Sequence, residues 1–188
     1  MQQAAQHARG TSAAHDDGEG LEEVQQYLTF MLGGETFAIG ILQIKEIIEF
    51  AGFTTVPMMP RCIRGVINLR GSVVPVLDLS ARFGRAPTEA TRRTCIVIVE
   101  VESDEGHQDI GVIVDAVNEV LEIPASEIEP APSFGTRLRP ELIAGMGKVG
   151  GQFVIVLDTD RVLANEELLA ITGESGAEPA RQQAHAVV

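Results

Sequence analysis

Residues 57–84 read PMMPRCIRGVINLRGSVVPVLDLSARFG, and this stretch decides the fold. Two runs of branched and apolar residues, 67–69 and 72–79, meet at Arg70 and Gly71. Branched side chains favour the pleated backbone and glycine permits a tight turn. The stretch therefore predicts a β-hairpin with Arg70 at its tip.

Arginines gather around this hairpin although the whole chain is acidic. Five arginines and one acid, Asp78, stand between residues 61 and 85, a net charge of +4 in a chain of net charge −13. From 95 to 130, in contrast, there are ten acids and neither lysine nor arginine. Arginine is favoured at interfaces because its planar group pairs with carboxylates while its stem covers apolar area. The cluster predicts a protein-docking surface, and solvated surface charges are the alternative.

The composition indicates a globular protein with an aliphatic core. Of 188 residues, 45% are apolar, only 4% are aromatic and none is tryptophan. A core of valine, isoleucine and leucine favours β-structure. The charge argues against a nucleic-acid partner, because such surfaces hold phosphates with lysine and arginine. No apolar run is long enough to cross a bilayer or to act as a secretory signal, so we expect a cytoplasmic protein with no membrane insertion.

Paired glycines mark two further hairpins, because both glycines can take the positive φ values of a primed turn. The pairs lie at 33–34 and 150–151, and they separate the extended runs 26–32 and 35–40, and 142–149 and 152–158. Strands are also expected at 95–101 and 109–117, around an acidic loop at 102–108, with 119–123 extending the same sheet.

Helical segments are predicted where apolar residues recur at spacings of three and four. Ile41, Ile44 and Ile48 then share one face, with Lys45 and Glu46 on the outer side. The predicted segments are 41–48, single turns at 61–66, 79–83 and 125–128, and a final helix at 159–172. The polar stretch 84–94 is expected to be a linker, and residues 1–22 and 173–188 are expected to be mobile tails.

One pattern repeats within the chain: a glycine turn, an extended run and a helical segment. It occurs at 34–44, 71–83 and 151–163, and the last two copies share a Val-Leu-Asp step ending at Asp78 and Asp158. Repeated hairpins with short helices suit a pair of small β-barrels that share a core, because closing a sheet removes its exposed edges.

The sequence offers little support for catalysis. His107 stands among acids in the 102–108 loop, which could bind a divalent metal or act as an acid–base group. The acids follow no metal-loop spacing, and a solvated loop is the preferred interpretation. Nucleotide motifs are absent, and Cys62 and Cys95 lie among apolar residues, where a thiol is unreactive. A metal-dependent enzyme built around His107 remains the alternative to a binding protein, and no cofactor is expected.

Several blocks of sequence resemble one known family. The motif NLRG at 68–71, flanked by IRGVI at 63–67 and VVPVLDL at 73–79, resembles the core signature of the CheW family of bacterial chemotaxis coupling proteins. The resemblance continues at 37–41 (FAIGI), 44–47 (IKEI) and 144–147 (AGMG), and covers about residues 24–170.

The resemblance implies a mostly β fold of two SH3-like, five-stranded β-barrels packed around a shared hydrophobic core, with short helices. The expected domain is a single CheW-like unit over residues 23–172 in which the chain crosses between barrels near 84–94. The implied function is that of a non-enzymatic adaptor that couples chemoreceptors to the histidine kinase CheA. An isolated kinase regulatory module of the same fold is a further alternative.

The resemblance also implies particular binding residues. In the family a receptor helix lies in a groove between the barrels, and the matching positions here are Ile44, Glu46, Gly65 and Arg70. Additional interface candidates are Met58, Arg64 and Val66. The expected partners are the cytoplasmic tip of a chemoreceptor and the regulatory domain of CheA, and the protein would be recruited to membrane-associated receptor arrays.

Overall fold

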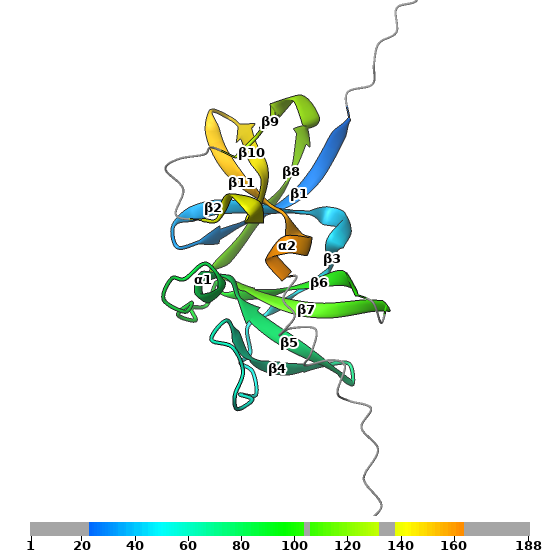
Figure 1. Cartoon of the computed structure of the whole chain (residues 1–188), viewed down its shortest axis with the longest axis vertical. Helices are drawn as coiled ribbons and strands as arrows, with labels where there is room; N and C mark the ends of the chain where they lie inside the picture. The colour runs from blue at the N-terminus through cyan, green and yellow to red at the C-terminus, as the bar shows by residue number, and fades with distance from the viewer. Residues whose placement is uncertain (1–22, 104–105, 132–137, 164–188) are drawn as a thin grey trace, which may run out of the picture.

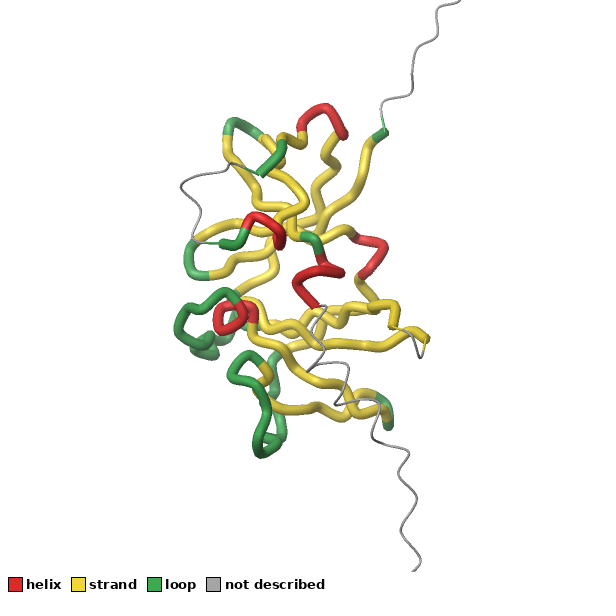
Figure 2. The backbone as a smooth tube through the Cα atoms, viewed as in Figure 1, coloured by secondary structure: helices red, strands yellow, loops and turns green. Residues whose placement is uncertain are grey.

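The computed structural model describes residues 23–103, 106–131 and 138–163, and their strands form two twisted sheets (Figures 1 and 2). The six-stranded sheet has the order β8-β1-β2-β11-β10-β9. Its strands are β1 (Val24–Leu32), β2 (Glu35–Gly40), β8 (Ala116–Pro124), β9 (Ile128–Glu129), β10 (Ile143–Val149) and β11 (Gln152–Leu157).

The five-stranded sheet has the order β3-β6-β7-β5-β4. Its strands are β3 (Ile44–Glu49), β4 (Ile63–Leu69), β5 (Ser72–Asp78), β6 (Cys95–Ser103) and β7 (Gly106–Val114). The described residues also contain five short helices, of which the last follows the final strand: η1 (Ile41–Gln43), α1 (Leu79–Arg82), η2 (Ala125–Glu127), η3 (Pro140–Leu142) and α2 (Thr159–Leu163). The last of these lies between the two halves of the molecule (Figure 1).

Each sheet curves around its own core, with β3 and β4 as the edges of one sheet and β8 and β9 as the edges of the other. The five-stranded barrel is filled by apolar side chains from all of its strands: Ile48, Ile67, Leu69, Val74, Val76, Ile96, Ile98 and Ile113. The six-stranded barrel is filled in the same way by Tyr27, Ala38, Leu121, Ile123, Ile128, Val149, Val154 and Val156. Its sixth strand is the two-residue β9, which the five-strand expectation did not include.

A third and larger core joins the barrels. Alternate residues of the same strands point out of each barrel and pack together between them, among them Phe30, Phe37, Val97, Val99 and Val112. Successive side chains on a strand point to opposite faces, so these central strands are apolar on both. The prediction of two SH3-like barrels around a shared core is confirmed.

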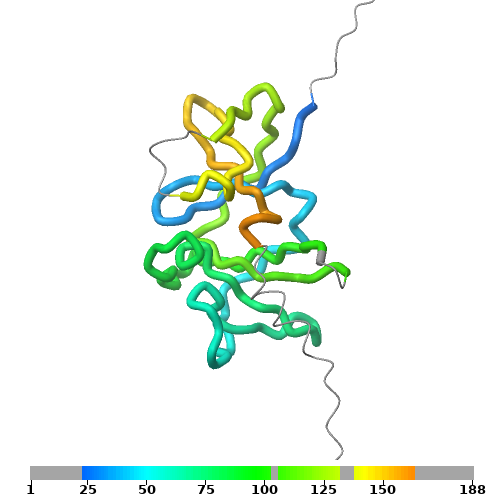
Figure 3. The backbone as a smooth tube through the Cα atoms, in the orientation of Figure 1, coloured from blue at the N-terminus to red at the C-terminus, as the bar shows by residue number. Residues whose placement is uncertain are grey.

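The chain path differs from the prediction at the linker. Residues 84–94 join α1 to β6 within the five-stranded sheet, so the expected crossing there is wrong. The chain crosses at η1, between β2 and β3, and again at Asp115, between β7 and β8. One barrel is therefore built from the continuous segment 44–114, inserted between two parts of the other (Figure 3).

The second crossing also redirects β8. The segment 119–123 was expected to extend the β6–β7 sheet, but β8 pairs with β1 of the other barrel. The turn is held because the Asp115 amide donates to the Met31 carbonyl, and the Asp115 carboxylate accepts a 2.7 Å bond from the Gly33 amide.

Two helix predictions are wrong. Within 41–48 only η1 is helical, and β3 takes the rest, with residues alternating between half-buried and exposed. The turn expected at 61–66 is largely part of β4, which begins at Ile63. The three hairpins, the turn at 79–83 and the short turn at 125–128 are confirmed. The expected mobile tails and the end of the 159–172 helix lie outside the described residues.

The internal repeat is also visible in three dimensions. The β10–β11 hairpin repeats β4–β5 at positions eighty residues later, from Ile63 and Ile143 to the buried strand ends at Leu77 and Leu157. Both copies have a register shift before the matching glycine, Gly65 or Gly145. The two barrels therefore contain equivalent hairpins, and a residue that differs between equivalent positions is a candidate for a role specific to one barrel.

Candidate protein-binding surface

The β4–β5 hairpin carries Arg70 at its tip, as the sequence predicted. Arg70 has a φ of +51°, a conformation that costs free energy for any residue with a Cβ, and Gly71 follows at +92°. The Asn68 side chain supports the turn by accepting a 2.9 Å hydrogen bond from the Gly71 amide. The arginine side chain is 77% exposed. A strained turn thus holds a long cation out in solvent.

Arg70 forms a two-pronged ion pair with Glu46 of β3. The two guanidinium nitrogens donate to the two carboxylate oxygens at 2.7 and 2.8 Å. Because β3 and β4 are the two edge strands of the five-stranded sheet, this pair spans the seam of the barrel. Exposed pairs contribute only about 0–1 kcal/mol to stability, so a partner's carboxylate can displace Glu46 at small cost.

Ile44 and Gly65 occupy less exposed positions near this seam. Ile44 begins β3, is half-buried and packs against the shared core. Gly65 faces the backbone of the preceding loop: a Cβ added there would lie 2.2 Å from the Thr54 carbonyl oxygen. The amide of Thr54 and the carbonyl of Val66 are bonded at 2.8 Å, and the reverse pair at 2.9 Å. Gly65 therefore has a structural role in letting this loop pair with β4.

The three additional interface candidates differ in how far their side chains are exposed. Met58 is fully exposed and adopts a φ of +62°. Val66 is half-buried. Arg64 points inward: it forms a 2.7 Å ion pair with the buried Asp78, and its guanidinium lies 5.2 Å from the centre of the Phe53 ring.

Three arginines of the cluster are engaged in internal contacts. Besides Arg64, Arg82 of α1 donates to the Val162 carbonyl of α2, and Arg85 pairs with Glu35 of the other barrel. Arg82 and Arg85 link the two barrels, whereas Arg64 is held within the five-stranded barrel and Arg70 projects from its seam. We therefore expect the docking surface to include Arg70, at the tip of the hairpin, rather than the whole arginine cluster.

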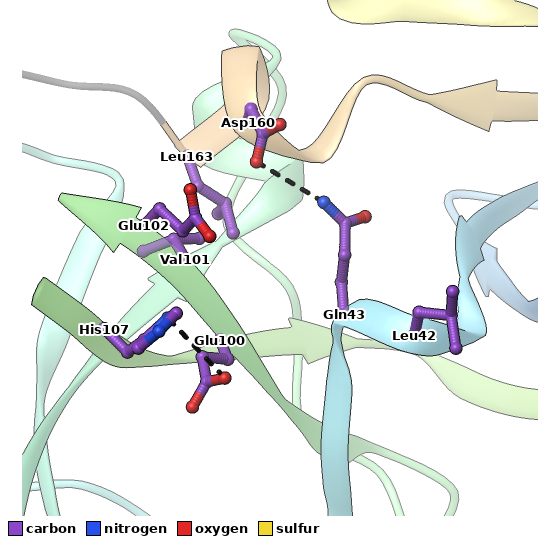
Figure 4. Close-up of a pocket in the computed structure, with 8 residues that line it drawn as sticks. All are labelled: Leu42, Gln43, Glu100, Val101, Glu102, His107, Asp160 and Leu163. Carbon is purple, nitrogen blue, oxygen red and sulfur yellow. Dashed lines mark hydrogen bonds and ion pairs between the residues drawn. The ribbon is translucent and has the colours of Figure 1, made fainter.

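The seam continues into a groove that sequence reasoning missed. A cavity of about 410 Å³ lies between the end of β3 and the middle of β4, with Ile48, Phe53, Val66 and Ile67 among its lining residues. The apolar residues that line it were predicted to lie in separate helices, loops and strands, so the sequence alone did not bring them together. A separate cavity of about 560 Å³ lies beside η1, where the two barrels meet, and its lining includes none of the predicted binding residues (Figure 4).

His107 does not form a metal site with the acids that the structure describes. It lies on β7 opposite Glu102, and its ring nitrogen is 3.8 Å from the Glu100 carboxylate. Asp104 and Glu105 lie outside the described residues, and within the described part of the chain no three histidine, cysteine or acidic side chains are grouped to hold a metal. The arrangement gives the metal-enzyme alternative no support.

The neighbouring acids are instead used by Lys45, which the sequence did not identify. Its ammonium nitrogen is 2.7 Å from both Glu100 of β6 and Asp109 of β7. The hydrogen bonds to Asp109 and then Glu100 raise the pKa of Lys45 above its ordinary 10.5. The bond from Lys45 in turn lowers the pKa of Glu100 below 4.5.

This ion pair predicts a pH dependence of stability. Because the folded-state pKa of Glu100 is lowered, its stabilising contribution is present above pH 4.5 and disappears as the pH falls through the lower folded-state value. Lys45→Met removes the partner, so we expect the stability difference between wild type and variant to shrink below pH 4.5. Denaturant unfolding from neutral to acidic pH measures it, and a difference that stays constant contradicts this account.

Comparison with known proteins gives the family. A model of the CheW-like domain matches residues 26–167. The chain is 33% identical over 147 residues to a chemotaxis protein CheW of Klebsiella aerogenes, covering 78% of this chain and 86% of that one. It is 34% identical over 142 residues to the Bacillus subtilis protein of the same name, covering 76% and 88%.

A solved structure of a related protein has a similar fold. The scaffolding protein TtCheW of Thermoanaerobacter tengcongensis superposes with a TM-score of 0.69 at 30% identity, covering 77% of this chain and 96% of that one. None of the helices in the described residues is long and apolar enough to span a membrane. The fold, the NLRG hairpin and these matches together show that the chain belongs to the CheW-like domain family.

Proposed function

We propose that this protein is a non-enzymatic adaptor that couples chemoreceptors to the histidine kinase CheA. Its relatives are named as chemotaxis proteins, and the similar solved structure is described as a scaffolding protein. The observation that carries the proposal is the ion pair between Arg70 and Glu46, because it presents an exchangeable charge near a groove with both apolar and polar lining residues.

The receptor-binding surface in this proposal is the barrel seam. Helices dock into apolar grooves through side chains, and charged residues at the rim fix their register. Here Ile44 and Val66 contribute apolar area, while Arg70 and Glu46 form the charged rim. Gly65 keeps the loop against β4 and so preserves the shape of the surface.

The kinase would use a different surface. The regulatory domain of CheA is the second partner in this proposal, and the adaptor reaches the membrane arrays only by binding receptors. Since the seam belongs to the five-stranded barrel, the six-stranded barrel stays free for the kinase while a receptor is bound. The two binding activities are then separable by mutation.

The test is a charge reversal at the hairpin tip. Arg70→Glu places two carboxylates side by side and repels the acids that Arg70 would pair with, so we expect receptor affinity to fall at least about tenfold. The melting temperature should stay nearly unchanged, because an exposed pair contributes little. Pulldown with a receptor cytoplasmic fragment measures the loss.

A matched variant controls for the change of charge. Arg161 of α2 is also exposed and pairs with an acid, Asp158. Arg161→Glu should capture the receptor fragment as wild type does. Equal capture by the Arg70→Glu protein would discredit the seam as the receptor site.

A further inference from the structure

A hollow of about 550 Å³ lies at the second crossing between the barrels. Three parts of the chain line it: residues 91–93 of the linker, Met31 near the end of β1, and Asp115 and Ala116 at the crossing itself. The linker lies on the opposite side of the molecule from η1 (Figure 2). The hollow is therefore separate from the cavity beside η1, and its lining includes none of the seam residues.

Two neighbouring arginines give the hollow a basic wall. Arg92 and Arg93 are both exposed, and both line it. Neither guanidinium forms an ion pair or a hydrogen bond with the described residues, unlike the arginines that make internal contacts. The one acid among the described lining residues, Asp115, uses a carboxylate oxygen to accept the bond from the Gly33 amide. The two cations are therefore available to a ligand.

The backbone that carries these arginines is held in a fixed turn. The Thr91 amide donates to the Thr94 hydroxyl at 2.8 Å, and the Thr94 amide donates back to the Thr91 carbonyl at 3.2 Å. The Arg93 amide donates to the Thr91 hydroxyl at 3.1 Å. Thr94 is buried and leads directly into β6. Binding therefore costs the ordering of two side chains, and not the ordering of a loop.

Apolar side chains of the other barrel lie beside the two cations. Met31 of β1 is half-buried, and Ala116 of β8, its partner in the strand register, is almost fully buried. Methionine is unbranched and adapts its shape to varied apolar partners. An inorganic anion reaches the arginines but leaves this apolar area uncovered. A peptide that carries acids next to an apolar side chain can contact both.

We propose that the hollow binds an acidic segment of a partner protein, in which glutamate or aspartate residues flank an apolar side chain. The carboxylates pair with Arg92 and Arg93, because a guanidinium presents two donors in the geometry of a carboxylate. The apolar side chain covers Met31 and Ala116. This activity goes beyond the proposed function, since it uses no part of the seam and is compatible with a bound receptor.

Two peptides of equal length test the charge preference. They share a central leucine, and the flanking residues are glutamates in one peptide and lysines in the other. We expect the glutamate peptide to bind at least about tenfold more tightly by fluorescence anisotropy at physiological salt, where the screening length is about 8 Å. The net charge of −13 favours the lysine peptide at long range, so the expected order requires local contacts. Equal affinities, or tighter binding of the lysine peptide, would overturn the proposal.

Charge-reversal variants locate the binding. Arg92→Glu and Arg93→Glu should each weaken the glutamate peptide about tenfold, because each replaces a pairing cation by a repelling acid. Lys148→Glu, the same charge change at an exposed position of β10, should not weaken it. Melting curves should stay unchanged, since neither arginine side chain has an internal partner among the described residues. If the arginine variants bind the peptide as Lys148→Glu does, the inference fails.

A third peptide distinguishes an acidic segment from a simple anion. It keeps the glutamates and has serine in place of leucine, and we expect it to bind at least about fivefold more weakly because the apolar contact is lost. If it binds as tightly as the leucine peptide, and inorganic phosphate displaces both, the hollow is an anion site and the proposal is wrong.

Two further measurements separate this inference from the seam and from self-association. Arg70→Glu should bind the glutamate peptide as wild type does, and Arg92→Glu should still capture the receptor fragment. Loss of the peptide with Arg70→Glu alone would assign it to the seam and reject the hollow. Wild type and Arg92→Glu should also sediment alike, and a wild-type dimer that Arg92→Glu dissociates would show that a second copy of the chain occupies the hollow instead.

Discussion

Replacing Asp78 by alanine should lower the free energy of unfolding by about 3 kcal/mol, since breaking a buried ion pair leaves charges and amides without partners. The Asp78 side chain is fully buried and holds three segments together. It pairs with Arg64 at 2.7 Å, accepts a 2.8 Å bond from the Thr88 amide in the linker, and caps α1 through the Ala81 amide. Denaturant unfolding measures the loss.

The repeat supplies the control. Asp158 ends the same Val-Leu-Asp step and accepts from the Arg161 amide, but its side chain is 29% exposed and its ion pair with Arg161 is local. Asp158→Ala should therefore cost only about 1 kcal/mol, as for the loss of a helix cap. Equal losses for the two variants would contradict the role assigned to Asp78 in fixing the linker.

Gly65→Ala should also be strongly destabilising, by about 3 kcal/mol, because the new methyl group has no room and the backbone must move. Its Cβ would lie 2.2 Å from the Thr54 oxygen and 2.8 Å from the Thr54 carbon, which are backbone atoms that a rotamer change cannot shift. The Thr54–Val66 bridge should open. Thermal unfolding and amide exchange at Val66 measure both effects.

The control separates crowding from backbone conformation. Gly71 has a φ of +92° and nothing within 4 Å of an added Cβ. Gly71→Ala should therefore lower the free energy of unfolding only through the left-handed conformation, by about 1–2 kcal/mol. If Gly65→Ala is no more harmful than Gly71→Ala, the close approach of Thr54 is not what requires the glycine.

Turn chemistry made the hairpins predictable. Gly33-Gly34, Gly150-Gly151 and Arg70-Gly71 each place positive φ values where two strands meet, and the structure has all three turns. The strand at 44–49 was harder, because isoleucines lie on both of its faces and mimic a helical spacing. Ile47 lies on the exposed face and is itself 43% exposed, so apolar residues do not alternate along this strand although burial does.

The chain crossings could not be predicted from composition. Residues 84–94 look like a linker between domains, yet Asp78 and Thr88 fix them within one barrel. The second real crossing is the single residue Asp115, which no composition shift marks. Local sequence indicates where the backbone turns. Which sheet a strand joins depends instead on pairing with a strand that is distant in the sequence.

The residues of the candidate site were named from the sequence, but their arrangement in space was not predicted. Glu46 and Arg70 were named from the family resemblance, and their ion pair across the seam is a tertiary contact that the sequence does not encode locally. The inward orientation of Arg64 is of the same kind, because it depends on the burial of Asp78. Charge clusters in a sequence therefore mix surface groups with structural ones.

The most direct test of the adaptor role is sedimentation of receptor-containing membranes mixed with CheA and this protein. We predict that wild type carries CheA into the membrane pellet, and that Arg70→Glu still binds CheA in solution but leaves it in the supernatant. Sedimentation of CheA that is the same with wild type, with the variant and without either protein would contradict the account.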